Sequence, residues 1–212
     1  MLGQGQLKQW VRWSFLWGSA VWMMGCSNPH QETIKELQAL ADSVELELVR
    51  LEEPSEENAV AAYNWADSQL REFELLLEGG LVTVSKSEGQ IISEVSRARR
   101  LLKDQAKRRL SLPKSAERAT MQLRGLADAI ASQNPKDAAG TPIDDLYIER
   151  ETTLEMGIAR DVIDALEETQ ELATRGISIE QAIRQQCDSL QTVCRSRLAH
   201  AILGSDSNPA SE

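Results

Sequence analysis

Residues 30–53 read HQETIKELQALADSVELELVRLEE, and they carry the most regular hydrophobic pattern in the chain. Their apolar residues recur at alternating steps of three and four, at Ile34, Leu37, Ala41, Val44, Leu48 and Leu51. This heptad spacing puts all of these side chains on one face of an α-helix. Because an isolated helix of this length is marginal in water, the pattern predicts an amphipathic helix that packs against other helices.

Similar spacing continues along the chain and predicts about six helical segments. Their expected bounds are residues 30–53, 55–77, 87–110, 114–130, 144–174 and 178–203. Proline or glycine stands at most of the breaks, at Pro54, Gly79-Gly80, Pro113 and Gly176. Ser178 with Gln181 predicts a capping box that opens the last segment. We therefore expect an all-α protein, built as an elongated antiparallel helical bundle or as coiled hairpins.

The composition excludes several other classes of protein. Aromatic residues are only 4% of the chain, and four of the five Trp lie before residue 23. An all-β sandwich or barrel needs more aromatic and β-branched residues than this body contains. With two His and three Cys in 212 residues, there is also little material for a metal site or a nucleophile. We expect no metal and no cofactor.

The N-terminal segment has the pattern of an export signal. Lys8 and Arg12 precede an apolar stretch at residues 13–24, and no acidic residue occurs before Cys26. The stretch ends in Met23-Met24-Gly25-Cys26, which resembles the lipobox of bacterial lipoproteins. The resemblance implies cleavage after Gly25 and acylation of Cys26. It divides the chain into a signal peptide at 1–25, a helical body at 26–203 and a flexible tail at 204–212.

Two other interpretations of this segment remain open. An uncleaved membrane anchor would run from about Trp10 to Cys26, which is at the short end of the roughly 17 to 25 residues that span a bilayer. An ordinary cleaved secretory signal would leave no lipid. In all three cases the body is exported from the cytoplasm.

A second resemblance covers much of the body. Three stretches carry it, SRARRLL at 96–102, QLRGLAD at 122–128 and YIERE at 147–151. Together with the lipobox and the acidic first helix, they resemble helical lipoproteins of Bacteroidetes, a group without an assigned activity. This resemblance implies an envelope location and a helical fold, and it supplies no site.

The residues after Cys26 bear on the final location. In lipoproteins of the proteobacterial type, Asp in the next position retains the protein at the inner membrane, and here that position is Ser27. The run at 27–31 also lacks the acidic tract that marks surface export in Bacteroidetes. We therefore expect an outer-membrane lipoprotein whose body faces the periplasm.

Charge is segregated along the chain, whose net charge is −10. Residues 32–57 and 144–171 are mainly acidic, and residues 86–124 are mainly basic. The basic run could serve as a patch for anionic lipid or nucleic acid. It could instead lie beside the acidic helices of the same chain, which we expect to be its main role. Nucleic acid is not an expected partner, because the run lacks stacking aromatic residues.

Cys187 and Cys194 stand on one face of the last segment. Seven residues of helix separate their Cα atoms by about 10 Å, beyond the roughly 7 Å limit for a disulfide. We expect two small core residues; the alternatives are an intermolecular disulfide across a dimer seam and pairing after a break in the helix. The carboxylates of residues 149–171 form no Glu-x-x-His motif, and we interpret them as solvated helix faces.

The sequence specifies the chemistry of one residue, Cys26. We expect no catalytic residues and hypothesise a lipid-anchored scaffold or interaction protein of the cell envelope, with a protein partner or a second copy of the chain. The alternatives are a periplasmic carrier or holdase for an apolar ligand or client, a membrane protein with an uncleaved N-terminal anchor, and a hydrolytic enzyme with a convergent polar site.

Overall fold

The structure, a computed structural model, describes residues 28–137 and 139–205, and the expected signal peptide and Cys26 lie outside these residues. The described residues contain no strand, which confirms the all-α prediction. They form five α-helices and one 3-10 turn: α1 (Gln31–Arg50), α2 (Glu56–Leu77), η1 (Glu78–Gly80), α3 (Lys86–Leu102), α4 (Gln105–Ala131) and α5 (Asp145–Ser205).

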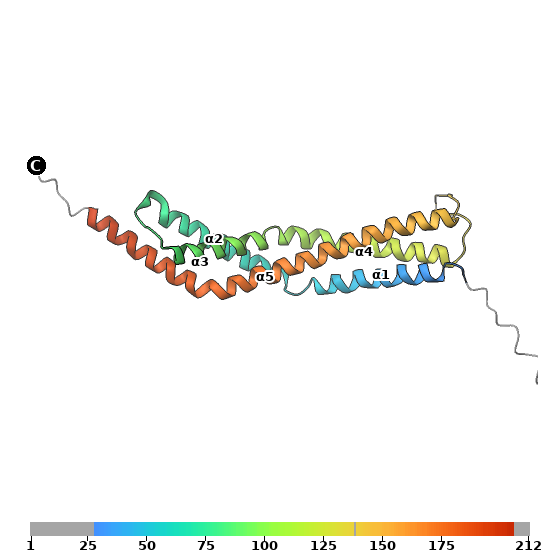
Figure 1. The fold of residues 1–212 in the computed structure, drawn as a ribbon, viewed down its shortest axis with the longest axis horizontal. Helices are drawn as coiled ribbons and strands as arrows, with labels where there is room; N and C mark the ends of the chain where they lie inside the picture. Colours follow the sequence, from blue (N-terminus) through green and yellow to red (C-terminus); the bar gives the residue numbers. More distant parts are fainter. Residues whose placement is uncertain (1–27, 138, 206–212) are drawn as a thin grey trace, which may run out of the picture.

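The helices lie along a single long axis (Figure 1). The chain runs down this axis through α1 and α2, returns through α3 and α4, and runs down again through α5. α1 and α4 pack against the first half of α5, whereas α2 and α3 pack against its second half. With 61 residues, α5 is about 90 Å long. The described body is therefore a rod.

The first two helices agree with the sequence pattern. Most of the α1 seam is buried, with Leu37 and Val44 fully inaccessible to solvent. The Ser55 hydroxyl accepts a hydrogen bond from the Asn58 backbone N–H and caps α2. Gly79 ends this arm of the chain at φ 83°, a conformation that other residues rarely adopt. The heptad steps and the cap placed both helices correctly.

The predicted break at Pro113 is wrong. α4 continues through Pro113, although the proline ring cannot donate a hydrogen bond to the carbonyl four residues earlier. The break lies instead at residues 103–104, where Asp104 has φ 64°. It changes the helical phase, and Leu110, the last residue of the expected segment 87–110, is 72% exposed. Burial of the α4 seam, including Leu123, holds the helix together across the proline.

The predicted break at Gly176 is also wrong. α5 is continuous from Asp145 to Ser205, so Ser178 lies inside the helix and caps nothing. Gly176 is there because of packing: a Cβ at this position would lie 2.5 Å from Leu102 Cγ. The glycine lets α5 approach the end of α3. The two last predicted segments are therefore one helix.

Three buried clusters make up the core. The largest joins α1, α4 and the first half of α5, and the second joins α2, α3 and the second half of α5. Between them is a small cluster of Ala59, Ala62, Leu102 and Ala173. Small side chains at mid-length let α2, α3 and α5 approach closely where the two larger clusters meet.

Candidate functional site

The end of the rod where the described chain begins is the part nearest to the expected anchor. Gly25 and Cys26 themselves lie outside the described residues. The Asn28 side-chain amide donates to the Ile130 carbonyl oxygen at 3.0 Å, and His30 Nε2 lies 3.2 Å from Asp145 Oδ1. These contacts join the start of α1 to the end of α4 and the start of α5. The chain thus enters the rod at its tip.

The loop between α4 and α5 is organised by Asp137. Its carboxylate accepts hydrogen bonds from the Thr141 N–H at 2.7 Å, the Ala139 N–H at 2.9 Å and the Tyr147 hydroxyl at 3.2 Å. The Thr141 bond is the main reason why the pKa of Asp137 is lowered. The loop therefore needs an ionised Asp137, which stabilises the tip of the rod.

A shallow hollow of about 320 Å³ lies beside this loop, between α4 and α5. Glu155 lines it, and burial raises the pKa of this carboxyl, with the nearby Glu151 as a second cause. One Glu155 oxygen, Oε2, is buried without a hydrogen-bond partner. Because that oxygen is inaccessible from the hollow, the geometry does not make a binding site of it.

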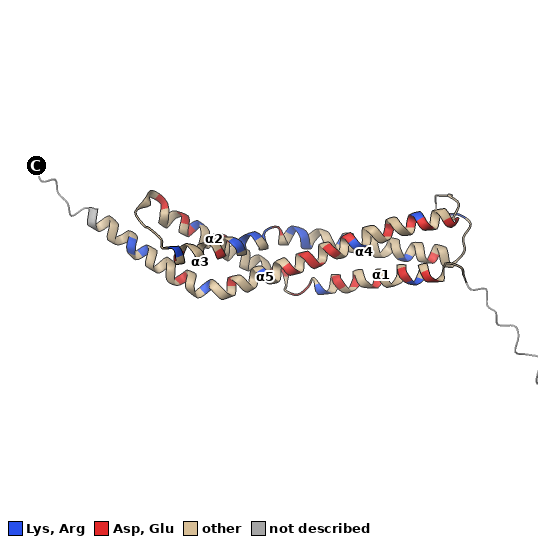
Figure 2. Ribbon diagram, in the orientation of Figure 1, with Lys and Arg blue, Asp and Glu red and all other residues tan. Residues whose placement is uncertain are grey.

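Part of the basic run pairs with acidic helices of the same chain, as predicted. Arg99 Nε lies 2.7 Å from Asp67 on α2, and Arg108 Nη1 lies 2.8 Å from Glu168 on α5. Arg124 lies within 3.1 Å of acidic residues on α1. Figure 2 shows the basic residues gathered at mid-length, where α3 gives way to α4. These pairs connect neighbouring arms of the rod.

Arg109 is the one arginine of this run that is buried, with 8% of its surface exposed. Its guanidinium donates to the Leu51 carbonyl oxygen, at the turn that follows α1. Beside it, the buried Gln105 amide donates to the Thr169 carbonyl oxygen on α5 at 3.2 Å. Burial lowers the pKa of Arg109. The sequence offers no signal for this role, because Arg109 stands in a run of surface-type cations.

The two cysteines are both free and fully buried on α5. Cys187 Sγ donates to Gln69 Oε1 at 3.5 Å. Burial, followed by the nearby Asp188 and Glu72, raises the pKa of Cys187 to about 12, and burial also raises the pKa of Cys194. Since the thiolate is the nucleophile and the metal ligand, neither thiol is activated at neutral pH.

The acidic residues of α5 are dispersed rather than convergent. Glu168 pairs with Arg108, Glu171 pairs with Arg175, and Glu151 pairs with Arg150. Within residues 28–137 and 139–205, no group of three His, Cys, Asp or Glu side chains has the geometry of a metal site. These carboxylates belong to ion pairs and to the solvated side of the helix.

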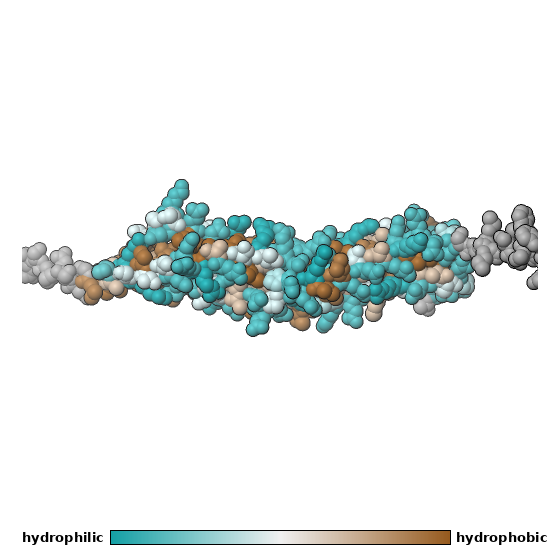
Figure 3. All heavy atoms as spheres, turned by 90° about the horizontal axis from the view of Figure 1, so that it is seen from below, coloured by the Kyte–Doolittle hydropathy of each residue, from teal (hydrophilic) through white to brown (hydrophobic). Residues whose placement is uncertain are grey.

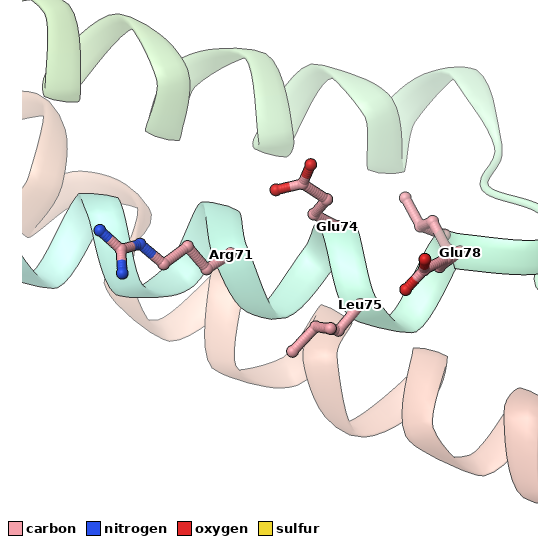
Figure 4. Close-up of a pocket in the computed structure, with 5 residues that line it drawn as sticks. Arg71, Glu74, Leu75 and Glu78 are labelled. Atoms are coloured by element: carbon pink, nitrogen blue, oxygen red, sulfur yellow. The ribbon is translucent and has the colours of Figure 1, made fainter.

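Two further hollows lie on the half of the rod that contains α2 and α3. The larger, about 680 Å³, is lined only by residues of α2 and the first residue of η1. Figure 4 shows Arg71, Glu74 and Leu75 pointing in different directions around that helix. The other, about 440 Å³, lies between α3 and α5 and includes Ile91 and Val193. Neither brings together groups that could perform acid–base or nucleophilic chemistry.

Comparisons with protein-family models, with curated proteins and with solved structures gave no match to this chain. Among the helices that the structure describes, none is both long and apolar enough to cross a membrane. The features of this chain that bear on function are its N-terminal sequence, the shape of the rod and the charges on its sides.

Proposed function

We propose that this chain is a lipid-anchored, non-catalytic scaffold of the bacterial cell envelope. In this proposal the signal at residues 1–25 is removed after Gly25 and Cys26 is acylated. The body is an elongated antiparallel helical bundle, attached to the outer membrane and facing the periplasm. It holds a protein partner or a second copy of the chain.

The observation that carries this proposal is the position of the first described residues. Asn28 is fixed at the tip of the rod by its bond to the Ile130 carbonyl, and Cys26 precedes it by only two residues. Two or three acyl chains hold a protein on a bilayer almost irreversibly, at about 0.8 kcal/mol per buried methylene. Lipid on Cys26 would therefore hold the rod by its end.

The packing of the rod supports a scaffold more than a carrier. The apolar seams of all five helices meet in buried clusters, and the hollows on the surface carry charged or amide side chains. The thiols are buried and protonated, and the carboxylates are paired or dispersed. One observation favours the carrier: the hollow between α3 and α5, where Val193 is 41% exposed.

The test compares the native chain with Cys26→Ser in cells, using a fatty-acid probe and membrane fractionation. We expect the probe on the native chain only, and we expect the variant to be released or to accumulate as uncut precursor. Crosslinking should then show a partner that the native chain contacts and the released variant loses. Equal labelling of both chains would disprove acylation at Cys26.

The same experiment separates a scaffold from a carrier by whether the released variant keeps its bound partner or ligand. A carrier would keep its ligand or client after release from the membrane, because its groove is unchanged. A scaffold would lose its partner, because the partner is met only at the membrane. An uncleaved anchor would leave both chains in the membrane at their full mass.

A further inference from the structure

The outer side of α4 presents cations that take no part in holding the rod together. Lys107, Lys114 and Arg118 are spaced by seven and four residues, so they stand on one face of the helix. All three are exposed, and no ion pair or hydrogen bond of their side chains occurs among the described residues. Arg100 and Lys103, near the end of α3, are exposed as well.

Two exposed apolar side chains lie among these cations. Leu110 is 72% exposed and Met121 is 64% exposed. Each lies three residues from one of the cations, Leu110 from Lys107 and Met121 from Arg118, so they border the same face. We call Lys107, Leu110, Lys114, Arg118 and Met121 the basic face of α4. Cations interleaved with apolar side chains are typical of helices that lie on a membrane surface.

Intrachain pairing does not account for this face. The neighbouring Arg99, Arg108 and Arg124 each reach a carboxylate on another helix. The cations of the basic face, in contrast, have no carboxylate partner among the described residues, although the chain as a whole has a net charge of −10. Its local acids are few: Asp104 and Glu117 are the only ones between Lys103 and Arg118. The face has the charge that complements an anionic surface.

The basic face also lies within reach of the proposed anchor. Asn28 contacts Ile130, near the end of α4. Arg118 lies 12 residues before Ile130 and Lys107 lies 23 before it, which is about 18 Å and about 35 Å along the helix. A rod held at its tip can lie on its side and bring this face onto the headgroups that surround the anchor.

We propose that the basic face of α4 docks on anionic phospholipid headgroups and lays the rod along the membrane. This inference rests on the proposed acylation of Cys26, which supplies the tether. Each Lys or Arg near an anionic bilayer strengthens binding by roughly fivefold, so three act by a factor on the order of 100. Figure 3, a view from below, shows that hydrophilic side chains cover most of that side of the rod.

The experiment uses the full, acylated protein in vesicles made with or without phosphatidylglycerol. A dye is placed at Ser111→Cys, beside the basic face, or at Asp164→Cys, on the solvated side of α5. The native thiols do not compete, since Cys187 and Cys194 are buried. Quenching by a headgroup-labelled lipid then reports which side of the rod lies near the bilayer.

With phosphatidylglycerol we expect the dye at residue 111 to be quenched several-fold more than the dye at residue 164. The difference should vanish without anionic lipid, and in about 1 M salt, where the screening length is about 3 Å. It should also vanish in the triple variant Lys107→Glu, Lys114→Glu, Arg118→Glu. The matched control Lys35→Glu, Lys86→Glu, Arg160→Glu makes the same charge change at exposed, unpaired positions elsewhere and should keep the difference.

Equal quenching of the two dyes with and without phosphatidylglycerol would overturn the proposal. So would an equal effect of the two triple variants, because that would indicate overall charge rather than this face. If the first variant loses a co-purifying acidic protein while its quenching is unchanged, the face binds that protein and the lipid proposal is wrong.

Absence of the lipid anchor is detected by a separate measurement, flotation with neutral vesicles. A chain without lipid would not float with neutral vesicles, which contradicts the proposed function. Flotation with phosphatidylglycerol vesicles then still tests the basic face. We expect the chain to bind these vesicles, and we expect the first triple variant to bind them more weakly by on the order of 100-fold. The control triple variant should bind them as the native chain does. Circular dichroism of both variants confirms that the helices are retained.

Discussion

Glu88 shows how one side chain can serve two elements. Its carboxylate accepts the Ser85 backbone N–H at 2.7 Å while the Ser85 hydroxyl accepts the Glu88 N–H, which completes a capping box at the start of α3. The same carboxylate pairs with the Arg197 guanidinium on α5 at 2.9 Å. Arg197, followed by the Ser85 N–H, lowers the pKa of Glu88 from 4.5 to about 2.

This arrangement makes stability depend on pH. A carboxyl whose pKa is lower in the folded chain stabilises the fold above its unfolded pKa and loses that effect as pH falls. We expect Glu88→Gln to lower the free energy of unfolding at neutral pH. The difference from the native chain should shrink between about pH 4.5 and about pH 2. Urea unfolding over this range measures it. Glu36→Gln, at an exposed position without a partner, should show no comparable effect.

Gly176 gives a second prediction at the residue scale. A Cβ there would lie 2.5 Å from Cγ of the buried Leu102, so Gly176→Ala should destabilise the fold by about 1–3 kcal/mol. Gly157→Ala is the matched control, because it lies in the same helix with nothing within 4 Å of the added Cβ. It should stabilise by up to about 1 kcal/mol. If thermal unfolding showed equal gains for both variants, the close approach at Leu102 would be incorrect.

At the scale of elements, the apolar pattern predicted where helices lie better than where they break. The seams of α1 and α2 and the Ser55 cap follow from local spacing, which is visible in the sequence. The breaks at Pro113 and Gly176 fail because packing outweighed local propensity. α4 continues through Pro113 because one face of the helix is buried on both sides of the proline. α5 continues through Gly176 because the missing Cβ leaves room for Leu102. Such contacts lie between residues distant in the chain, so spacing alone could not reveal them.

The continuity of α5 can be tested at Ser178. In an unbroken helix, Ser178→Pro removes a backbone hydrogen bond and clashes with the preceding turn, which costs about 3 kcal/mol or more. At the N-cap of a separate helix, where the capping box would put Ser178, proline would remove only the serine cap, which costs about 1 kcal/mol. We expect a large loss of stability in urea unfolding. Ser178→Ala, at the same exposed position, should change stability by less than about 1 kcal/mol. A loss of only about 1 kcal/mol for Ser178→Pro would indicate two separate helices.

The candidate sites were predictable to different degrees. Segregated charge predicted that basic and acidic helices would pair, and Arg99 with Asp67 and Arg108 with Glu168 do so. The spacing of the two cysteines predicted that they would stay unpaired. The buried role of Arg109 was not predictable, because its burial depends on the turn after α1 folding over it.

At the scale of the whole molecule, the described residues form a rod. The length of α5 sets a maximum dimension of about 90 Å or more. A compact domain of this size would instead have a radius of gyration of roughly 16 Å. Small-angle X-ray scattering of residues 28–205 should give a radius of gyration well above that value. A value close to it would mean that the two halves fold back on each other.

The anchor is the central claim, and the intact mass of the protein purified from its native membrane tests it most directly. We expect a chain that begins at Cys26 and carries the added mass of a diacylglyceryl group on the thiol, with or without an acyl group on the new N-terminus. A mass that retains residues 1–25, or a mature chain without lipid on Cys26, would contradict the account.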